Sequence, residues 1–191
     1  DISREETFQN TRSRHAISFR VRAAVDKEGR LMARECVAVS NQGGYASHGH
    51  AIVANAVTGF RQTYPEALGH RSEAYTVYTN LGATGAMRAY GIPQSSFAAE
   101  CFMEDMALQF GFDPYEFRLK NIMPLGYKDP FNGITCYSTG LKECMEKGAA
   151  FIGWAEKRAR YRSQTGPVRR GVGMALFSYK TGVYPISLET S

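Results

Sequence analysis

Hydrophobic residues alternate with mostly polar ones along residues 16–25, AISFRVRAAV. A period of two is typical of a strand that buries one face and exposes the other. The sequence DKEG that follows predicts a turn, in which Gly29 can adopt a positive φ. Residues 30–41, RLMARECVAVSN, resume a strand-like pattern. Together the two segments predict a β-hairpin.

The next part of the chain combines one short helix with one strand. Glycines open the stretch QGGYASHGHAIVANAVTGF, and its apolar second half predicts a helix over residues 51–60. Residues 71–80, RSEAYTVYTN, predict a further strand, and this strand leads into the loop NLGATGAMRAYGIPQ. The loop is therefore expected to connect a strand to the helix that follows it.

A helix is expected after Pro93. Ser95 and Ser96 are good N-cap residues, because a serine side chain can accept a hydrogen bond from a backbone N–H of the first turn. Apolar residues then recur at steps of three and four, and Gly111 ends the pattern.

Two more helices and a strand-like segment follow. Asp113 and Pro114 form a helix start, with a cap and then a proline at the first helical position, and predict a helix to Asn121. A third helix is expected over residues 141–162, and from Gly171 onward the pattern is strand-like. The apolar face of the third helix consists of Leu141, Cys144, Met145, Phe151 and Ile152.

The order of these elements indicates the fold class. Strands, then helices, then a strand-like end predict an α+β fold with mixed β-sheets and packed helices. The sequence has no internal repeat or low-complexity tract and no clear domain boundary, so residues 1–191 are expected to belong to one domain.

Composition narrows the possible partners. Hydrophobic residues make up 43% of the chain and charged residues 21%, which fits a globular protein. The net charge is +5, but the most basic segment, residues 155–171, is explained by a solvated helix end and a loop, so no nucleic-acid partner is expected. No apolar run is long enough to span a bilayer, and no membrane partner is expected. The four cysteines are far apart and predict reduced thiols in a cytoplasmic protein.

One cation lies among small residues in the loop that precedes Pro93. Arg88 follows glycines and alanines, whose small size lets a ligand approach the backbone. Its guanidinium is a fixed charge with planar donors, and the ring of Tyr90 can stack on a planar ligand. The dinucleotide and P-loop consensus sequences are absent. The residues alone indicate an anion-binding loop, or else an ion pair for Arg88 and a core position for Tyr90.

Several ordered motifs resemble those of one known family. Residues 85–126, GAMRAYGIPQSSFAAECFMEDMALQFGFDPYEFRLKNIMPLG, are similar to the signature block of the molybdenum hydroxylases, the xanthine dehydrogenase and aldehyde oxidase family. In that family an FRGFG-PQ loop leads into one helix and then into a G-DP-E-R--N helix. Residues 3–33 and 40–49 resemble the family's upstream segments, so the resemblance covers residues 3 to about 125. It implies hydroxylation of an N-heterocycle (purine-like) or an aldehyde with water-derived oxygen.

The resemblance implies roles for three residues. Arg88 corresponds to an arginine that binds the molybdenum–molybdopterin cofactor, and Tyr90 to an aromatic residue, usually Phe, that stacks on the substrate ring. Asn55 falls where purine-oxidising members carry a substrate-orienting arginine. An amide cannot offer a full charge to a developing oxyanion, and this departure argues against a purine substrate. No residue is expected to coordinate the metal directly.

Other parts of the family pattern are absent from these residues. The general-base glutamate in its G-GE motif, the Gln-containing loop near the metal, and the iron–sulfur and flavin modules have no counterpart in the sequence. The chain also begins with DISREETF, without an initiator methionine. We therefore expect an internal fragment of the molybdopterin-binding subunit that is inactive alone and works with iron–sulfur and flavin subunits or domains in an oligomer.

Two other functions remain open. A non-catalytic scaffold or subunit-contact domain of the same fold would use the apolar residues 45–57 as its contact surface. A nucleotide-binding or nucleic-acid-binding module would use the basic segment 157–170, and its binding would weaken steeply with salt.

Overall fold

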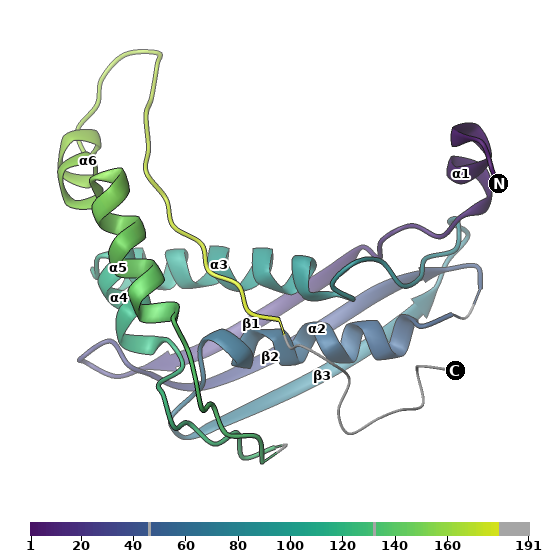
Figure 1. Cartoon of the computed structure of the whole chain (residues 1–191), viewed down its shortest axis with the longest axis horizontal. Helices are drawn as coiled ribbons and strands as arrows, with labels where there is room; N and C mark the ends of the chain where they lie inside the picture. The colour runs from purple at the N-terminus through teal and green to yellow at the C-terminus, as the bar shows by residue number, and fades with distance from the viewer. Residues whose placement is uncertain (46, 132, 180–191) are drawn as a thin grey trace.

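A single mixed sheet is the centre of the fold. The computed structural model describes residues 1–45, 47–131 and 133–179. The described strands form one sheet in the order β1-β2-β3. β1 (Ile17–Val25) pairs antiparallel with β2 (Leu31–Gly43), and β2 pairs parallel with β3 (Gly69–Tyr78) (Figure 1). The predicted hairpin and the predicted α+β class are confirmed.

Two helices cover one face of this sheet (Figure 1). α2 (Gly49–Thr63) connects β2 to β3, and because these strands are parallel the connection must cross over the sheet. α3 (Ile92–Gln109) packs beside α2. The helix predicted over residues 51–60 is thus longer at both ends, because its last turn remains buried against the rest of the fold.

The predicted alternation in β1 is observed, since every second residue from Ile17 is half-buried and the intervening residues are exposed. In β2 the buried positions include Cys36 and Ala38, which have no exposed surface. They belong to a core cluster with Phe60 of α2 and Ala99 of α3. Burial also raises the pKa of the Cys36 thiol to about 11, so this thiol stays protonated at neutral pH.

The remaining helices lie at the ends of the molecule. α1 projects from one end, and α5 and α6 project from the opposite end (Figure 1). These elements are α1 (Arg4–Asn10), α4 (Pro114–Asn121), α5 (Leu141–Ile152) and α6 (Trp154–Tyr161).

The predicted N-caps of α3 are wrong. The helix begins at Ile92, and its N-cap is Gly91 in the left-handed region with φ 96°. Ser95 is therefore inside the first turn, where it is buried and its hydroxyl donates to the Ile92 carbonyl at 3.1 Å. Pro93 is compatible with this earlier start because the first turn of a helix does not require its missing N–H.

The single helix predicted over residues 141–162 is also wrong. Gly153 adopts a left-handed conformation with φ 63° and separates α5 from α6. The predicted apolar face is only partly buried: Met145 faces the core, but Phe151 is 92% exposed. A change of direction at Gly153 rotates the two short helices relative to one another, so one continuous stripe cannot form.

The strand expected from Gly171 is absent from residues 171–179, which are extended without forming a ladder. Residues 180–191, where that prediction continues, lie outside the described residues. The segment crosses α3 (Figure 1), and alternate residues are half-buried. Leu176 packs against the core cluster around Met103 and Phe117. Helix contact, and not pairing with the described strands, therefore explains the period-two pattern.

Two linked ion pairs lie in the interior between the sheet and the helices. Arg34 and Glu66 form an ion pair with fully buried side chains, and Arg34 also donates to the Tyr64 carbonyl at 2.9 Å. Burial alone raises the pKa of Glu66, but the His70 hydrogen bond and the Arg34 charge outweigh it and hold this pKa below its usual value. The second ion pair joins Arg118 to Glu100 of α3. The Tyr64 hydroxyl donates to Glu100 at 2.7 Å and so connects the two pairs.

Replacing Asp113 with Ala is expected to lower the free energy of unfolding by about 1–2 kcal/mol, the usual cost of losing an N-cap. Asp113 Oδ1 accepts from the Tyr115 amide at 2.9 Å and from Trp154 Nε1 at 3.2 Å, so it ties α4 to α6. Urea unfolding of the complete subunit measures the loss. The control is Asp105→Ala on the exposed face of α3, which should change stability by less than about 0.5 kcal/mol. Equal losses in both variants would contradict the capping role.

Candidate functional site

The loop of residues 79–91 is held in place by backbone hydrogen bonds from two other segments. The Gly85 amide donates to the Ser13 carbonyl at 3.0 Å, and the Thr84 amide donates to the Gln42 carbonyl at 3.2 Å. The Gly44 amide donates to the Leu81 carbonyl at 3.1 Å. The start of the chain and the end of β2 therefore position the loop before it reaches α3.

The end of this loop has an unusual backbone. Ala89, Tyr90 and Gly91 have φ angles of 69°, 47° and 96°, so three consecutive residues are left-handed. For a residue with a Cβ this conformation costs about 1–3 kcal/mol, and it persists only where surrounding contacts impose it. A Cβ on Gly91 would lie 2.5 Å from the Ile52 carbonyl oxygen, so only glycine allows the loop to approach α2 this closely.

Arg14 and Gln94 impose part of this geometry. Arg14 Nη2 donates to the Arg88 carbonyl at 3.0 Å, and its Nη1 donates to Gln94 Oε1 at 3.4 Å. Gln94 Nε2 in turn donates to the His15 carbonyl at 2.9 Å. Sequence reasoning missed both as site residues, although Gln94 lies in the quoted segment 85–126 and Arg14 lies in residues 3–33, which resemble an upstream segment of the family.

His15 lies behind the loop and is only 2% exposed. Neither of its ring nitrogens has a hydrogen-bond partner among the described residues. Burial lowers the pKa of His15, because a charged imidazolium would be poorly solvated there. The ring is therefore neutral at pH 7.

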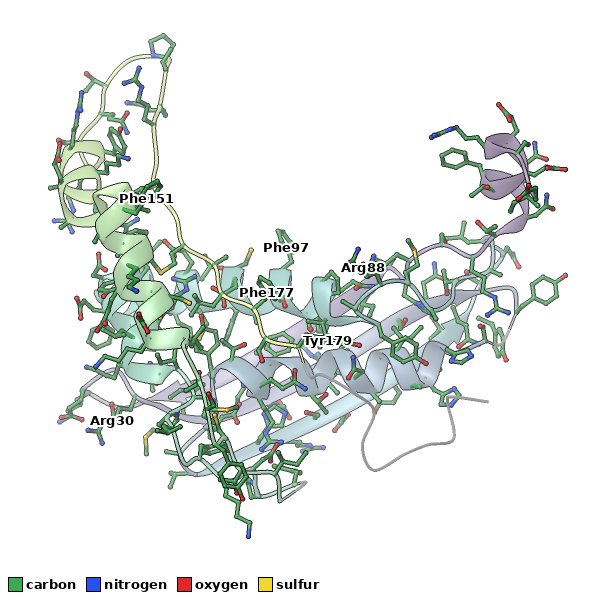
Figure 2. The ribbon with its side chains drawn as sticks, in the orientation of Figure 1. Arg30, Arg88, Phe97, Phe151, Phe177 and Tyr179 are labelled. Carbon is green, nitrogen blue, oxygen red and sulfur yellow. The ribbon has the colours of Figure 1, made fainter. Side chains whose placement is uncertain are left out.

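Arg88 is exposed at the end of the loop that leads into α3 (Figure 2). Within the part of the chain that the structure describes, its guanidinium forms no ion pair with a carboxylate. The backbone N–H groups of residues 86–89 also donate no hydrogen bond to any described residue. The loop thus presents a positive charge and several free donors, a combination that binds anionic oxygens.

Tyr90 and Asn55 are brought together by the tertiary structure. Asn55 Nδ2 donates to the Tyr90 carbonyl at 2.7 Å, and the Tyr90 hydroxyl is 2.8 Å from His48 Nδ1. Tyr90 is half-buried, so it is not a core residue. Asn55 thus uses one of the two N–H groups of its amide nitrogen to hold the backbone of the loop at Tyr90.

The surfaces expected for the two other functions are only partly available. Among the described residues of the segment 45–57, Tyr45 is exposed, but Ile52, Val53 and Val57 are buried in the core, so these residues form no continuous exposed apolar face. In the basic segment 157–170, Arg158 lies 3.8 Å from a carboxylate oxygen of Glu104. The proposed contact surface is therefore wrong, and the basic segment is partly neutralised.

The described residues contain neither a metal cluster nor a membrane-spanning helix. These residues contain no group of three or more His, Cys, Asp or Glu side chains placed to hold a metal ion. Among the described helices, none has the length and apolar character needed to cross a membrane. The loop around Arg88, with its supports on α2, is the candidate site because of the donors that it presents.

Comparisons with known proteins place the same loop within a recognised domain. The family described as the molybdopterin cofactor-binding domain matches residues 2–122. The chain is 42% identical over 188 residues to the putative xanthine dehydrogenase molybdenum-binding subunit XdhA of Escherichia coli strain K12. It is 33% identical over 147 residues to the nicotinate dehydrogenase large molybdopterin subunit of Eubacterium barkeri, which covers 76% of this chain and 34% of that protein.

A solved structure shows the same arrangement of elements. The aldehyde oxidoreductase from Desulfovibrio gigas superimposes with a TM-score of 0.73 and 29% sequence identity, over 84% of this chain and 17% of that chain. The alignment with the Escherichia coli subunit covers 98% of this chain and 25% of that protein. The chain therefore spans about a quarter of the length of such a relative.

Proposed function

Because the chain belongs to the family of molybdopterin cofactor-binding domains, we propose that it builds one wall of the active site of a molybdenum hydroxylase. The complete enzyme adds a water-derived oxygen to an electron-poor carbon of an N-heterocycle or an aldehyde. The names of the relatives, which refer to xanthine, nicotinate and aldehyde, support both substrate classes. The observation that carries the proposal is the loop of donors around Arg88.

The loop fits the cofactor as a set of hydrogen-bond donors. Arg88 and the free amides of residues 86–89 suit a ligand rich in oxygen acceptors and negative charge. When bound, the molybdenum–molybdopterin cofactor supplies the redox centre that takes two electrons from the substrate. Arg88 would hold the cofactor, and the preformed loop would bind it without first having to become ordered.

Tyr90 has a separate task in this proposal. Its ring is fixed at the site by Asn55 on the backbone side and by His48 on the hydroxyl side. A fixed aromatic face can stack on a planar substrate and orient the carbon that reacts. Tyr90 and Asn55 are therefore assigned to substrate binding, Tyr90 by direct contact and Asn55 by positioning it.

Other groups of the reaction are assigned to other parts of the enzyme. We place the general-base glutamate and the iron–sulfur and flavin cofactors on other domains or subunits of the assembled oligomer. The described cysteines Cys36, Cys101, Cys136 and Cys144 are free, which supports a reducing compartment such as the cytoplasm. Residues 1–191 then act as one piece of the molybdopterin-binding domain.

Replacing Arg88 with Ala in the complete, assembled enzyme is expected to reduce molybdenum content or kcat by about tenfold or more. A charge-assisted hydrogen bond contributes about 1.5–3 kcal/mol, and Ala removes both the charge and the donors. Elemental analysis per chain and steady-state turnover measure the two quantities.

The control for this experiment is Arg30→Ala. Arg30 is an exposed arginine in the turn between β1 and β2, on another side of the molecule from Arg88 (Figure 2). Its loss should leave molybdenum content and turnover within about twofold, as for most surface substitutions. If Arg88→Ala retains full molybdenum and full turnover, Arg88 has no role in cofactor binding.

A further inference from the structure

We propose that Arg14 is a positioning residue of the cofactor site, which fixes and polarises the peptide between Arg88 and Ala89 so that the Ala89 N–H donates to an oxygen acceptor of the cofactor. This role rests on the proposed function and deepens it, because it adds one backbone donor and a second arginine to the part assigned to Arg88. The carbonyl hydrogen bonds of the loop, the geometry of a trans peptide and the surroundings of Arg14 support it.

The four carbonyls of residues 87–90 each accept a hydrogen bond within the protein. Their donors are, in chain order, the Tyr90 amide at 2.8 Å, Arg14 Nη2 at 3.0 Å, the Ile92 amide at 2.9 Å and Asn55 Nδ2 at 2.7 Å. By contrast, the amides of Arg88 and Ala89 donate to no described residue. The loop therefore directs its acceptors toward the protein and leaves two neighbouring donors available to an anionic ligand.

The hydrogen bond to the Arg88 carbonyl sets the direction of the next amide. A trans peptide unit is planar, and its C=O and N–H point in opposite directions. Because the Arg88 carbonyl points to Arg14, the Ala89 N–H of the same unit points away from Arg14. Ala89 is left-handed with φ 69°, a conformation that persists only where surrounding contacts impose it. Arg14 thus fixes the orientation of the Ala89 donor.

The charge of Arg14 also strengthens this donor. Within the described residues Arg14 forms no ion pair with a carboxylate, so its charge is not neutralised by a neighbouring anion. A hydrogen bond from a charged donor is about twice as strong as one from a neutral donor. Hydrogen bonds in a chain polarise one another, so a strong bond to the carbonyl makes the N–H of the same peptide a better donor.

Gln94 of α3 holds Arg14 in this position. Its Oε1 accepts from Arg14 Nη1 at 3.4 Å, and its Nε2 donates to the His15 carbonyl at 2.9 Å. One glutamine therefore binds both the Arg14 side chain and the backbone of the residue that follows it. Arg14 is half-buried, so its guanidinium is a fixed part of the site and not a mobile surface charge.

Arg12 offers a matched control in the same segment. It is exposed, and its side chain packs against Gly85 at the other end of the loop. Within the described residues it donates no hydrogen bond to the carbonyls of residues 87–90. Arg12→Met removes the same charge from the neighbourhood of the loop and keeps an unbranched apolar stem for packing. Loss of charge alone is thereby separated from loss of the bond to the Arg88 carbonyl.

The first measurement is molybdenum per chain in the assembled enzyme. Arg14→Met removes both the charge and the donor, and should lower molybdenum content about tenfold. Arg14→Lys keeps a charged donor and should retain about half of the wild-type content or more. Arg12→Met should stay within about twofold of wild type. A loss in Arg12→Met as large as that in Arg14→Met would show that the bond to the carbonyl is not what matters.

The second measurement is the reduction potential of the molybdenum centre in Arg14→Gln, which keeps a neutral donor and lacks the charge. A weaker Ala89 donor stabilises the more negative, reduced centre less. The equilibrium constant for two-electron reduction should fall about three- to tenfold, which lowers the potential by about 15–30 mV. Arg12→Met should leave the potential unchanged.

Hydrogen exchange of peptides that cover residues 79–91 separates this role from a structural one. In Arg14→Gln the neutral donor still binds the carbonyl, so the loop should exchange as in wild type while the potential is lower. A potential that does not change, or one that changes only together with faster exchange of the loop, overturns the proposal. Arg14→Gln and Arg14→Lys keep a donor, so the test stands even if Arg14→Met does not fold.

Failure of the proposed function gives a different result. A wild-type enzyme without molybdenum, produced in a host that loads other molybdenum enzymes, would remove the cofactor assignment and the role of Arg14 together. A wild-type enzyme that is loaded, with Arg14→Met and Arg14→Gln equal to it in molybdenum content and potential, would remove only the role of Arg14.

Discussion

Replacing Arg118 with Met is expected to lower the free energy of unfolding by about 3–5 kcal/mol, the usual cost of removing one partner of a buried ion pair. The Arg118 side chain is 1% exposed, and its Nε donates to Glu100 Oε2 at 2.9 Å. Its Nη2 donates to the Glu100 carbonyl at 3.0 Å, and its Nη1 donates to the Pro114 carbonyl at 3.2 Å. Without the guanidinium, the Glu100 carboxylate stays buried beside α4, and among the described side chains only Tyr64 still donates to it.

The Arg118 side chain stays protonated in the folded protein. Burial alone lowers the pKa of Arg118, but interactions with Tyr64 and Glu100 outweigh it, so the pKa is raised. The guanidinium is therefore charged at any pH near neutrality, and the loss on substitution should not depend on pH in that range.

Urea unfolding, followed by hydrogen exchange of peptides that cover α3 and α4, measures this loss in the complete subunit. Glu104→Gln is the matched control, because Glu104 binds the same arginine at 2.9 Å but its side chain is 28% exposed. Its loss should cost no more than about 1 kcal/mol, as for other partly exposed ion pairs. Similar small losses for both variants would show that the Arg118–Glu100 pair is not a major source of stability.

Replacing Gly91 with Ala is expected to destabilise the region by about 2–4 kcal/mol and to reduce molybdenum content. A left-handed φ of 96° costs a residue with a Cβ about 1–2 kcal/mol. The added Cβ would also lie 2.5 Å from the Ile52 carbonyl oxygen, and overpacking of this kind costs about 1–3 kcal/mol. Relief of this clash requires the loop to move away from α2, which displaces Arg88 and Tyr90.

Hydrogen exchange of the loop and elemental analysis for molybdenum, both on the assembled enzyme, check this expectation. Gly111→Ala is the control, because Gly111 is also left-handed with φ 78° but its added Cβ would meet no atom within 4 Å. It should cost about 1–2 kcal/mol and leave molybdenum content unchanged. If Gly91→Ala behaves like Gly111→Ala, close contact between the loop and α2 is not what shapes the site.

Local hydrogen bonds explain why the start of α4 was predictable. Asp113 accepts from the Tyr115 amide, two residues away, and Pro114 needs no partner for its missing N–H. The β1–β2 hairpin was predictable for a similar reason, since its alternation and its turn at Gly29 lie in one short segment. By contrast, the start of α3 at Ile92 depends on Gly91 lying against Ile52, a contact that no local pattern encodes.

The residues of the candidate site also fall into two groups, those that sequence motifs predict and those that only the tertiary structure brings together. Arg88, Tyr90 and Asn55 were predicted as site residues from sequence motifs, because family motifs are read residue by residue. Their supports were not, since Arg14 binds the Arg88 carbonyl across 74 residues and His48 meets Tyr90 across 42. Such pairs exist only after α2 and α3 have packed on the sheet, and many side chains with the same chemistry were available in the sequence.

By itself, the sequence determined the hairpin, the approximate positions of most helices and the loop that carries Arg88. Tertiary structure alone decided where α3 begins, how Gly153 divides the last helix, and why residues 171–179 pair with no described strand. It also decided that Tyr90 lies along α2 between two polar side chains. The physical reason is the sequence separation over which each interaction acts. Caps, turns and periodicity depend on residues a few positions apart, whereas packing joins residues that are far apart in the sequence.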